Sequence, residues 1–145
     1  MWRYSIDIAG KKCVAKSELA DVCLELPVIN RAYAHANSDY RYVYGCGVNT
    51  SHDKEFYNQI VKIDVTNGTS RSWYKEGHYP GEPVFVPTPN SQTEDDGVLI
   101  SVVLDIHSNT SYLLLLNAAS MEQIAKATLP HSILFGYHGT FIQHN

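Results

Sequence analysis

Short apolar runs separated by turn residues occupy most of this chain. Aromatic side chains take every second position in the run Tyr40–Gly45, as in a strand with one buried face. Residues 59–65 and 71–74 are rich in β-branched and aromatic residues and flank Asn67-Gly68. Asn-Gly between two such runs is a strong hairpin signal. The pattern therefore predicts that 59–65 pairs antiparallel with 71–74.

A second hairpin is predicted from two nearly continuous apolar runs, 98–104 and 112–117, which a polar turn around Ser108 and Asn109 joins. The chain also starts with a strand-like run at residues 2–8. Only residues 120–125 fit a helical turn, and they fit equally well the start of a strand over 124–129. We therefore predict a nearly all-β chain.

Several short strands with regular turn signals are typical of a sandwich, a barrel or propeller blades. A propeller blade takes about 40–45 residues, so 145 residues would make roughly three blades, too few to close a ring. Composition alone does not choose among these architectures.

Composition and charge limit the function classes. The chain is 44% hydrophobic and 18% charged, which is typical of one globular domain. Its net charge of −4 gives no basic face for nucleic acid. No secretory signal and no run of about 18 apolar residues can be read. Cys13, Cys23 and Cys46 show no zinc or disulfide spacing, so we expect packing residues in an intracellular protein, cytoplasmic in the first place, with mitochondrial or membrane-associated locations left open.

Three residues are candidates for a buried metal site. His138 lies between two glycines in the β-like run 135–141; if this run is a strand, His138 shares a face with the small residues Gly136 and Thr140. Glu82 lies between Pro80 and Pro83, where a buried carboxylate needs a partner such as the N–H of a ligand imidazole. Glu25 stands alone between two leucines. The alternatives are a core histidine bonded to a carbonyl, an exposed turn acid, and an acid that reaches solvent.

The six other histidines are in turn-like or terminal sequence, and no two have the i, i+2 or i, i+4 spacing of a local chelate. We expect no ligand among them: His35, His52, His78, His107, His131 and His144.

Five sequence blocks, taken in order, resemble the C-terminal part of the carotenoid oxygenase family, in its animal branch of carotenoid-cleaving oxygenases and retinoid isomerohydrolases. The resemblance runs from about Trp2 to Phe141. The blocks are 24–30 (LELPVIN), 40–45 (YRYVYG), 79–87 (YPGEPVFVP), 94–103 (EDDGVLISVV) and 135–139 (FGYHG).

This resemblance implies a seven-bladed β-propeller with Fe(II) on its axis, held by four histidines that glutamates orient. Residues 1–145 would then be the C-terminal portion of one oxygenase domain, incomplete at its N-terminal side, and would form a partial propeller. His138 resembles the last iron ligand, and Glu82 and Glu25 resemble two of the glutamates. The blocks that carry the other three ligands would lie upstream of this sequence.

Three positions depart from the commonest family pattern. Gly81 stands where serine is frequent, Arg31 where an aromatic residue often follows the asparagine, and Asn117 where aspartate is usual. None of them is a ligand position.

The activity that the resemblance implies is oxidative cleavage of a conjugated double bond in a carotenoid, with O2 and Fe²⁺. The partners would be O2 and an apolar carotenoid or retinoid, with membrane contact made through parts outside this sequence. Two alternatives stay open: a retinoid isomerohydrolase fragment, and a non-catalytic β-rich interaction fragment. With one of four ligands, the isolated chain is expected to be inactive.

Overall fold

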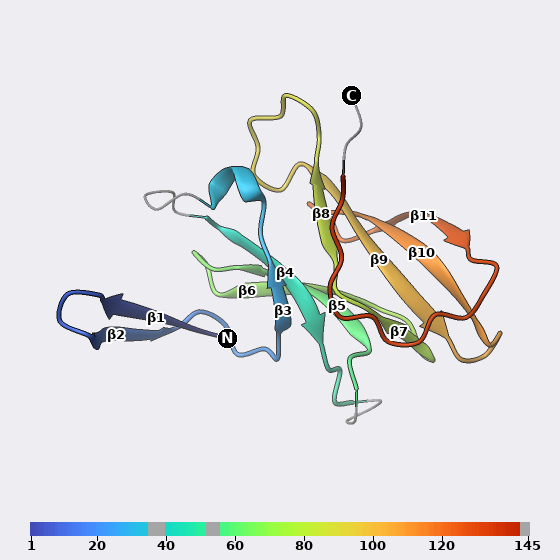
Figure 1. Cartoon of the computed structure of the whole chain (residues 1–145), viewed down its shortest axis with the longest axis horizontal. Coiled ribbons are helices and arrows are strands. Elements are labelled where there is room, and N and C mark those ends of the chain that lie inside the picture. The colour runs from blue at the N-terminus through green and yellow to red at the C-terminus, as the bar shows by residue number, and fades with distance from the viewer. Residues whose placement is uncertain (35–39, 52–55, 143–145) are drawn as a thin grey trace.

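The computed structural model describes residues 1–34, 40–51 and 56–142, and the described chain is built almost entirely from antiparallel strands (Figure 1). The N-terminal hairpin contains β1 (Trp2–Asp7) and β2 (Lys12–Glu18). The first sheet contains β3 (Glu25–Val28), β4 (Tyr42–Gly47), β5 (Gln59–Asp64) and β6 (Thr69–Tyr74). The second sheet contains β7 (His78–Pro80), β8 (Val84–Pro87), β9 (Gly97–Asp105), β10 (Thr110–Asn117) and β11 (Gln123–Thr128). The 3-10 turn η1 (Arg31–Tyr33) is the one helical element among the described residues.

The first sheet has the strand order β3-β4-β5-β6, with consecutive strands side by side. The predicted pairing of β5 with β6 is confirmed, from Gln59 opposite Tyr74 to Asp64 opposite Thr69. At the turn, Gly68 has φ +68° and its N–H donates to the Asp64 carbonyl at 2.9 Å. A left-handed residue is what a tight hairpin requires, and glycine adopts it without steric cost.

The second sheet has the order β11-β10-β9-β7, and β8 also pairs with β9. The predicted pairing of β9 with β10 is confirmed, with Val98 opposite Asn117 at one end. In their turn, Asn109 has φ +52°, and Asp105 Oδ1 accepts the His107 N–H at 3.0 Å. Residues 123–128 form a strand, so the helical alternative there is wrong.

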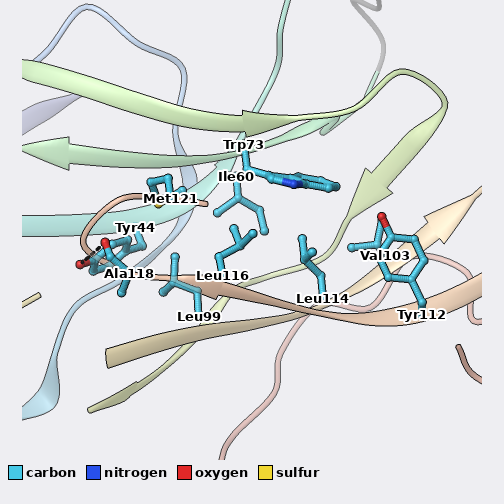
Figure 2. Packing of buried hydrophobic residues seen from close by; sticks show 10 residues of the cluster. All are labelled: Tyr44, Ile60, Trp73, Leu99, Val103, Tyr112, Leu114, Leu116, Ala118 and Met121. Carbon is cyan, nitrogen blue, oxygen red and sulfur yellow. Dashed lines mark hydrogen bonds between the residues drawn. The ribbon is translucent and has the colours of Figure 1, made fainter. Parts of the chain in front are cut away.

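The main core lies between the two sheets (Figure 2). It joins side chains of β4, β5 and β6 to side chains of β9 and β10 and of the turn that follows β10. Each fully buried leucine contributes roughly 1.5–3 kcal/mol. The cluster consists of Tyr44, Ile60, Trp73, Leu99, Val103, Tyr112, Leu114, Leu116, Ala118 and Met121.

A buried ion pair ties the two sheets together. Lys62 Nζ, on β5, lies 2.6 Å from Asp95 Oδ2 and 2.9 Å from the Ala119 carbonyl, both in loops of the second sheet. The two charged side chains are only 7% and 14% exposed. The ammonium also lies 4.2 Å from the centre of the Tyr42 ring.

Three expectations are wrong. Residues 135–141 form no strand; this segment runs beside β8 in an extended path (Figure 1), and its backbone joins no ladder of the described residues. His78 is not in a turn but in β7, and it is 2% exposed. Of the three cysteines only Cys46 is buried, and Cys13 and Cys23 are exposed free thiols.

The described residues hold no helix long and apolar enough to cross a membrane.

Candidate metal-ligand site

The strand opposite β9 is interrupted at Glu82. Pro80 pairs with Val103 and Val84 pairs with Ile100, so the three residues 81–83 lie opposite the two residues 101–102. One extra residue makes a β-bulge, which changes the direction of the strand and of its side chains. Proline at 80 and at 83 favours the interruption, because neither residue has an N–H to continue the ladder.

The C-terminal segment passes this bulge and brings His138 to Glu82. His138 Nδ1 lies 3.2 Å from Oε2 and 3.3 Å from Oε1 of Glu82. The Gly139 N–H donates to Glu82 Oε2 at 3.2 Å. Two of the candidate residues are therefore in contact, although the segment that carries the histidine is not a strand.

The contact fixes which ring nitrogen is available. A carboxylate only accepts hydrogen bonds, so Nδ1 of a neutral His138 carries the proton and Nε2 keeps its lone pair. The Glu82 side chain is 14% exposed, whereas that of His138 is 76% exposed. The carboxylate thus belongs to the folded body, and most of the imidazole surface faces outward.

Cys46 is the other titratable group at the bulge. Its thiol is buried on β4, and Sγ lies 3.8 Å from the Pro80 carbonyl. Burial, helped by the charge of Glu82, raises the pKa of this thiol to about 12. Cys46 therefore stays a thiol near neutral pH and packs as a small apolar side chain.

Glu25 does not join the pair. It begins β3 opposite Cys46, it is exposed, and no side chain among the described residues hydrogen-bonds its carboxylate. Leu26 has φ +52°, and the register shifts between Glu25 and Val28, so the regular alternation of side chains along a strand is broken here. Glu25 acts on its surroundings through its charge. Burial of Tyr57 raises the pKa of that hydroxyl most, and the negative charge of Glu25 raises it further.

The described residues contain no group of three or more His, Cys, Asp or Glu side chains that could hold a metal ion. His78 is buried, with Nδ1 3.2 Å from the Tyr112 hydroxyl, and burial lowers its pKa. His107 and His131 are exposed. His35, His52 and His144 lie outside the described residues.

A cleft of about 530 Å³ adjoins the pair. Its walls come from the end of β3 and the residues that follow it, from the bulge with β8, and from residues 139–141. Apolar side chains such as Val28, Val84 and Phe141 dominate them. Asn30 anchors the first wall, because its Nδ2 donates to the Glu94 carbonyl at 2.9 Å. Sequence reasoning missed this cleft, since its walls meet only in the fold.

Comparison with known proteins gives a family. The family model described as retinal pigment epithelial membrane protein matches residues 1–143. The mitochondrial carotenoid-cleaving dioxygenase of Macaca fascicularis is 42% identical over 104 residues, which cover 71% of this chain and 18% of that protein. Carotenoid cleavage dioxygenase 8, chloroplastic, of Arabidopsis thaliana is 34% identical over 145 residues, which cover 97% of this chain and 25% of that protein.

Solved structures show the same relationship. A chimera of ACO and RPE65 has a TM-score of 0.87 at 32% identity, and cobalt-substituted Synechocystis ACO has a TM-score of 0.87 at 31%. Each match covers 99% of this chain and 30% of the other. The chain thus spans about a fifth to a third of the length of these relatives, and its sheets correspond to part of their larger β-propeller. This protein belongs to the carotenoid oxygenase family.

Proposed function

We propose that this chain supplies one iron ligand, His138, and its carboxylate partner, Glu82, to a carotenoid-cleaving dioxygenase. One observation carries the proposal: Glu82 accepts the hydrogen bond of Nδ1 and leaves Nε2 of an outward-facing ring ready for a metal. Carboxylate–histidine–metal arrangements of this kind fix the tautomer and raise the basicity of the ligand. We also propose that residues 1–145 are the C-terminal portion of one oxygenase domain.

The donor set fits a shared site. A single imidazole does not hold Fe(II) against water and competing metals, because affinity comes from several ligands held in one geometry. The described residues contain no group of three or more His, Cys, Asp or Glu side chains that would form such a set. The family resemblance implies three further histidines upstream, so the proposal places this ligand at an edge where other blades complete the site.

Glu25 fits the same proposal as the partner of one of those upstream histidines. It is exposed, and its carboxylate accepts no hydrogen bond from a described side chain. An acid placed between two leucines would gain a hydrogen-bond donor when the missing part of the propeller is present.

The roles of the chain's own residues follow from their contacts. Glu82 holds the His138 ring in one orientation and offsets part of the charge of a bound cation. The neighbouring cleft offers apolar walls for part of a carotenoid. Fe(II), when bound, would supply the O2 chemistry that cleaves a conjugated double bond.

An intracellular location is part of the proposal. Its support is the word mitochondrial or chloroplastic in the names of the relatives, together with three free cysteines. Cell fractionation of the full-length protein would test whether it is cytoplasmic and whether it associates with membranes.

A chimera tests the function. This chain would replace the corresponding 30% of Synechocystis ACO, which it matches with a TM-score of 0.87. The proposal predicts cleavage of a carotenoid or apocarotenoid by the chimera and its loss on His138→Ala. A chimera that is folded and binds iron but cleaves no such substrate would contradict the dioxygenase assignment. Release of a retinol isomer from a retinyl ester would instead support the isomerohydrolase alternative.

The interaction-fragment alternative has an observation of its own. The hairpin residues Trp2, Tyr4, Ile6 and Ile8 are 46–82% exposed, a large apolar stripe for a protein surface. If the chain acts by association alone, its binding to a partner will survive His138→Ala and Glu82→Gln. The enzyme proposal instead predicts that both variants weaken metal binding.

A further inference from the structure

A serine interrupts the core-facing row of β9. Leu99 and Val103, two positions to either side of Ser101, are fully buried between the sheets. Ser101 is itself only 3% exposed. A hydroxyl in such a place costs free energy unless it is hydrogen-bonded, so the serine needs a partner.

The partner is the carbonyl of Gly81, at the bulge between β7 and β8. Ser101 Oγ donates to this carbonyl at 2.8 Å, while the alternative acceptor, the Val102 carbonyl, is 3.4 Å away. The Gly81 N–H donates to that Val102 carbonyl at 2.8 Å. Both backbone groups of Gly81 are therefore bonded to β9, although this residue lies outside the strands on either side.

The Gly81 carbonyl belongs to the same planar peptide unit as the Glu82 nitrogen. A hydrogen bond to that carbonyl therefore fixes the plane from which the Glu82 side chain projects. Pro83 follows directly and restricts the chain on the other side. The Glu82 carboxylate can then meet His138 Nδ1 and the Gly139 N–H at the same time.

We propose that Ser101 is a positioning residue for the metal-ligand pair: its hydroxyl holds the Gly81–Glu82 peptide so that the carboxylate fixes the His138 tautomer. The relay runs from Ser101 to the Gly81 carbonyl, to Glu82 and then to His138. Its catalytic meaning rests on the proposed function, but the geometric claim concerns the metal-free chain alone.

The test is NMR of the metal-free chain with ¹⁵N-labelled histidine, at a pH where His138 is neutral. The two ring nitrogens have distinct ¹⁵N shifts, so the spectrum reports which of them carries the proton. The wild-type chain is expected to show Nδ1–H at His138. Ser101→Ala should reduce this form in favour of Nε2–H, and the Gly139 amide should exchange with solvent about 10-fold faster.

Three further variants separate positioning from stability. Ser101→Thr keeps the hydroxyl and should restore the wild-type signals. Ser101→Cys fills the site but donates only weakly, so it should behave like Ser101→Ala. Val103→Ala, on the same buried face, removes packing but leaves the Ser101 bond in place, and should leave the His138 tautomer unchanged.

The proposal is overturned if Ser101→Ala and Ser101→Cys keep the wild-type tautomer and Gly139 exchange rate, or if Val103→Ala causes the same loss. A wild-type chain with Nε2–H at His138 would also overturn it. Because no metal is present, a chimera that failed to bind iron would refute the proposed function and leave this result standing.

Discussion

Glu82 and His138 lie 56 residues apart in sequence, yet Oε2 of one is 3.2 Å from Nδ1 of the other. The carboxylate is held in the folded body, and the imidazole arrives on a segment that belongs to no sheet. The orientation of the ring therefore depends on Glu82 more than on regular backbone pairing.

Glu82→Gln in the chimera should weaken metal affinity or activity by about 10–100-fold, since an amide is a poorer partner for the ligand N–H. Metal titration and turnover measure the effect. Glu76→Gln, at an exposed acid outside the site, is the control and should change neither. Equal losses in both variants would show that the effect is not specific to the pair.

Lys62→Met should destabilise the chain by about 3–5 kcal/mol, because it leaves Asp95 charged and only 14% exposed without its partner. The double variant Lys62→Met/Asp95→Leu should recover much of this loss, since it removes both charges. Urea denaturation measures the free energies of unfolding. If the double variant loses as much unfolding free energy as Lys62→Met and Asp95→Leu lose separately and in sum, the two residues are not coupled.

Asp64 gives a pH-dependent contribution. Its hydrogen bond to Arg41, with the turn N–H groups of Thr66 and Asn67, lowers the pKa of this carboxyl from 3.8 to about 2. A carboxyl whose pKa is lower in the folded than in the unfolded state stabilises the fold at pH values above its unfolded pKa. This stabilisation is lost as pH falls from about 4 to about 2. Because Arg41 is 45% exposed, solvent screening limits the expected effect of Asp64→Asn to about 1 kcal/mol at pH 7.

The measurement is the difference in unfolding free energy between the wild-type chain and Asp64→Asn at a series of pH values. This difference should shrink toward zero as pH approaches 2. A difference that stays constant over this range would contradict the account.

Gly81→Ser should be tolerated, although Gly81 is the residue before Glu82. An added Cβ would meet the Val102 and Gly136 carbonyl oxygens at 3.4 and 3.6 Å, which is ordinary contact. Gly97→Ala is the contrasting variant, because its Cβ would lie 2.5 Å from the Val86 carbonyl oxygen. Thermal unfolding should show a small change for the first variant and a clear loss for the second. A large loss for Gly81→Ser would mean that the bulge is tighter than the structure indicates.

Much of the fold could be predicted because its signals are local. Asn67-Gly68 and the polar turn at Asn109 fix two hairpins, and the apolar runs beside them fix which strands are buried. The elements that could not be predicted depend on tertiary contacts. His78 looks like a turn residue after Gly77, but Tyr112 of a distant strand covers it.

The sequence singled out Glu82 and His138 as candidates, but it did not predict the backbone path that brings them into contact. The resemblance indicated Glu82 and His138, whereas the run around His138 looked like a strand because its apolar residues are those that strands prefer. The segment 135–141 contains two glycines and is extended, but it pairs with no strand among the described residues. Ser101 did carry a signal, a polar residue in an apolar row, but its partner could be found only in the structure.

We propose that this chain carries one ligand of an iron site and that other parts of a propeller complete the site. Iron content per chain, measured by elemental analysis after purification, tests it most directly. We predict no stoichiometric iron in the isolated 145-residue chain, about one iron in the ACO chimera that contains it, and loss of that iron on His138→Ala. One tightly bound iron in the isolated chain, or a chimera whose iron is unaffected by His138→Ala, would contradict the account.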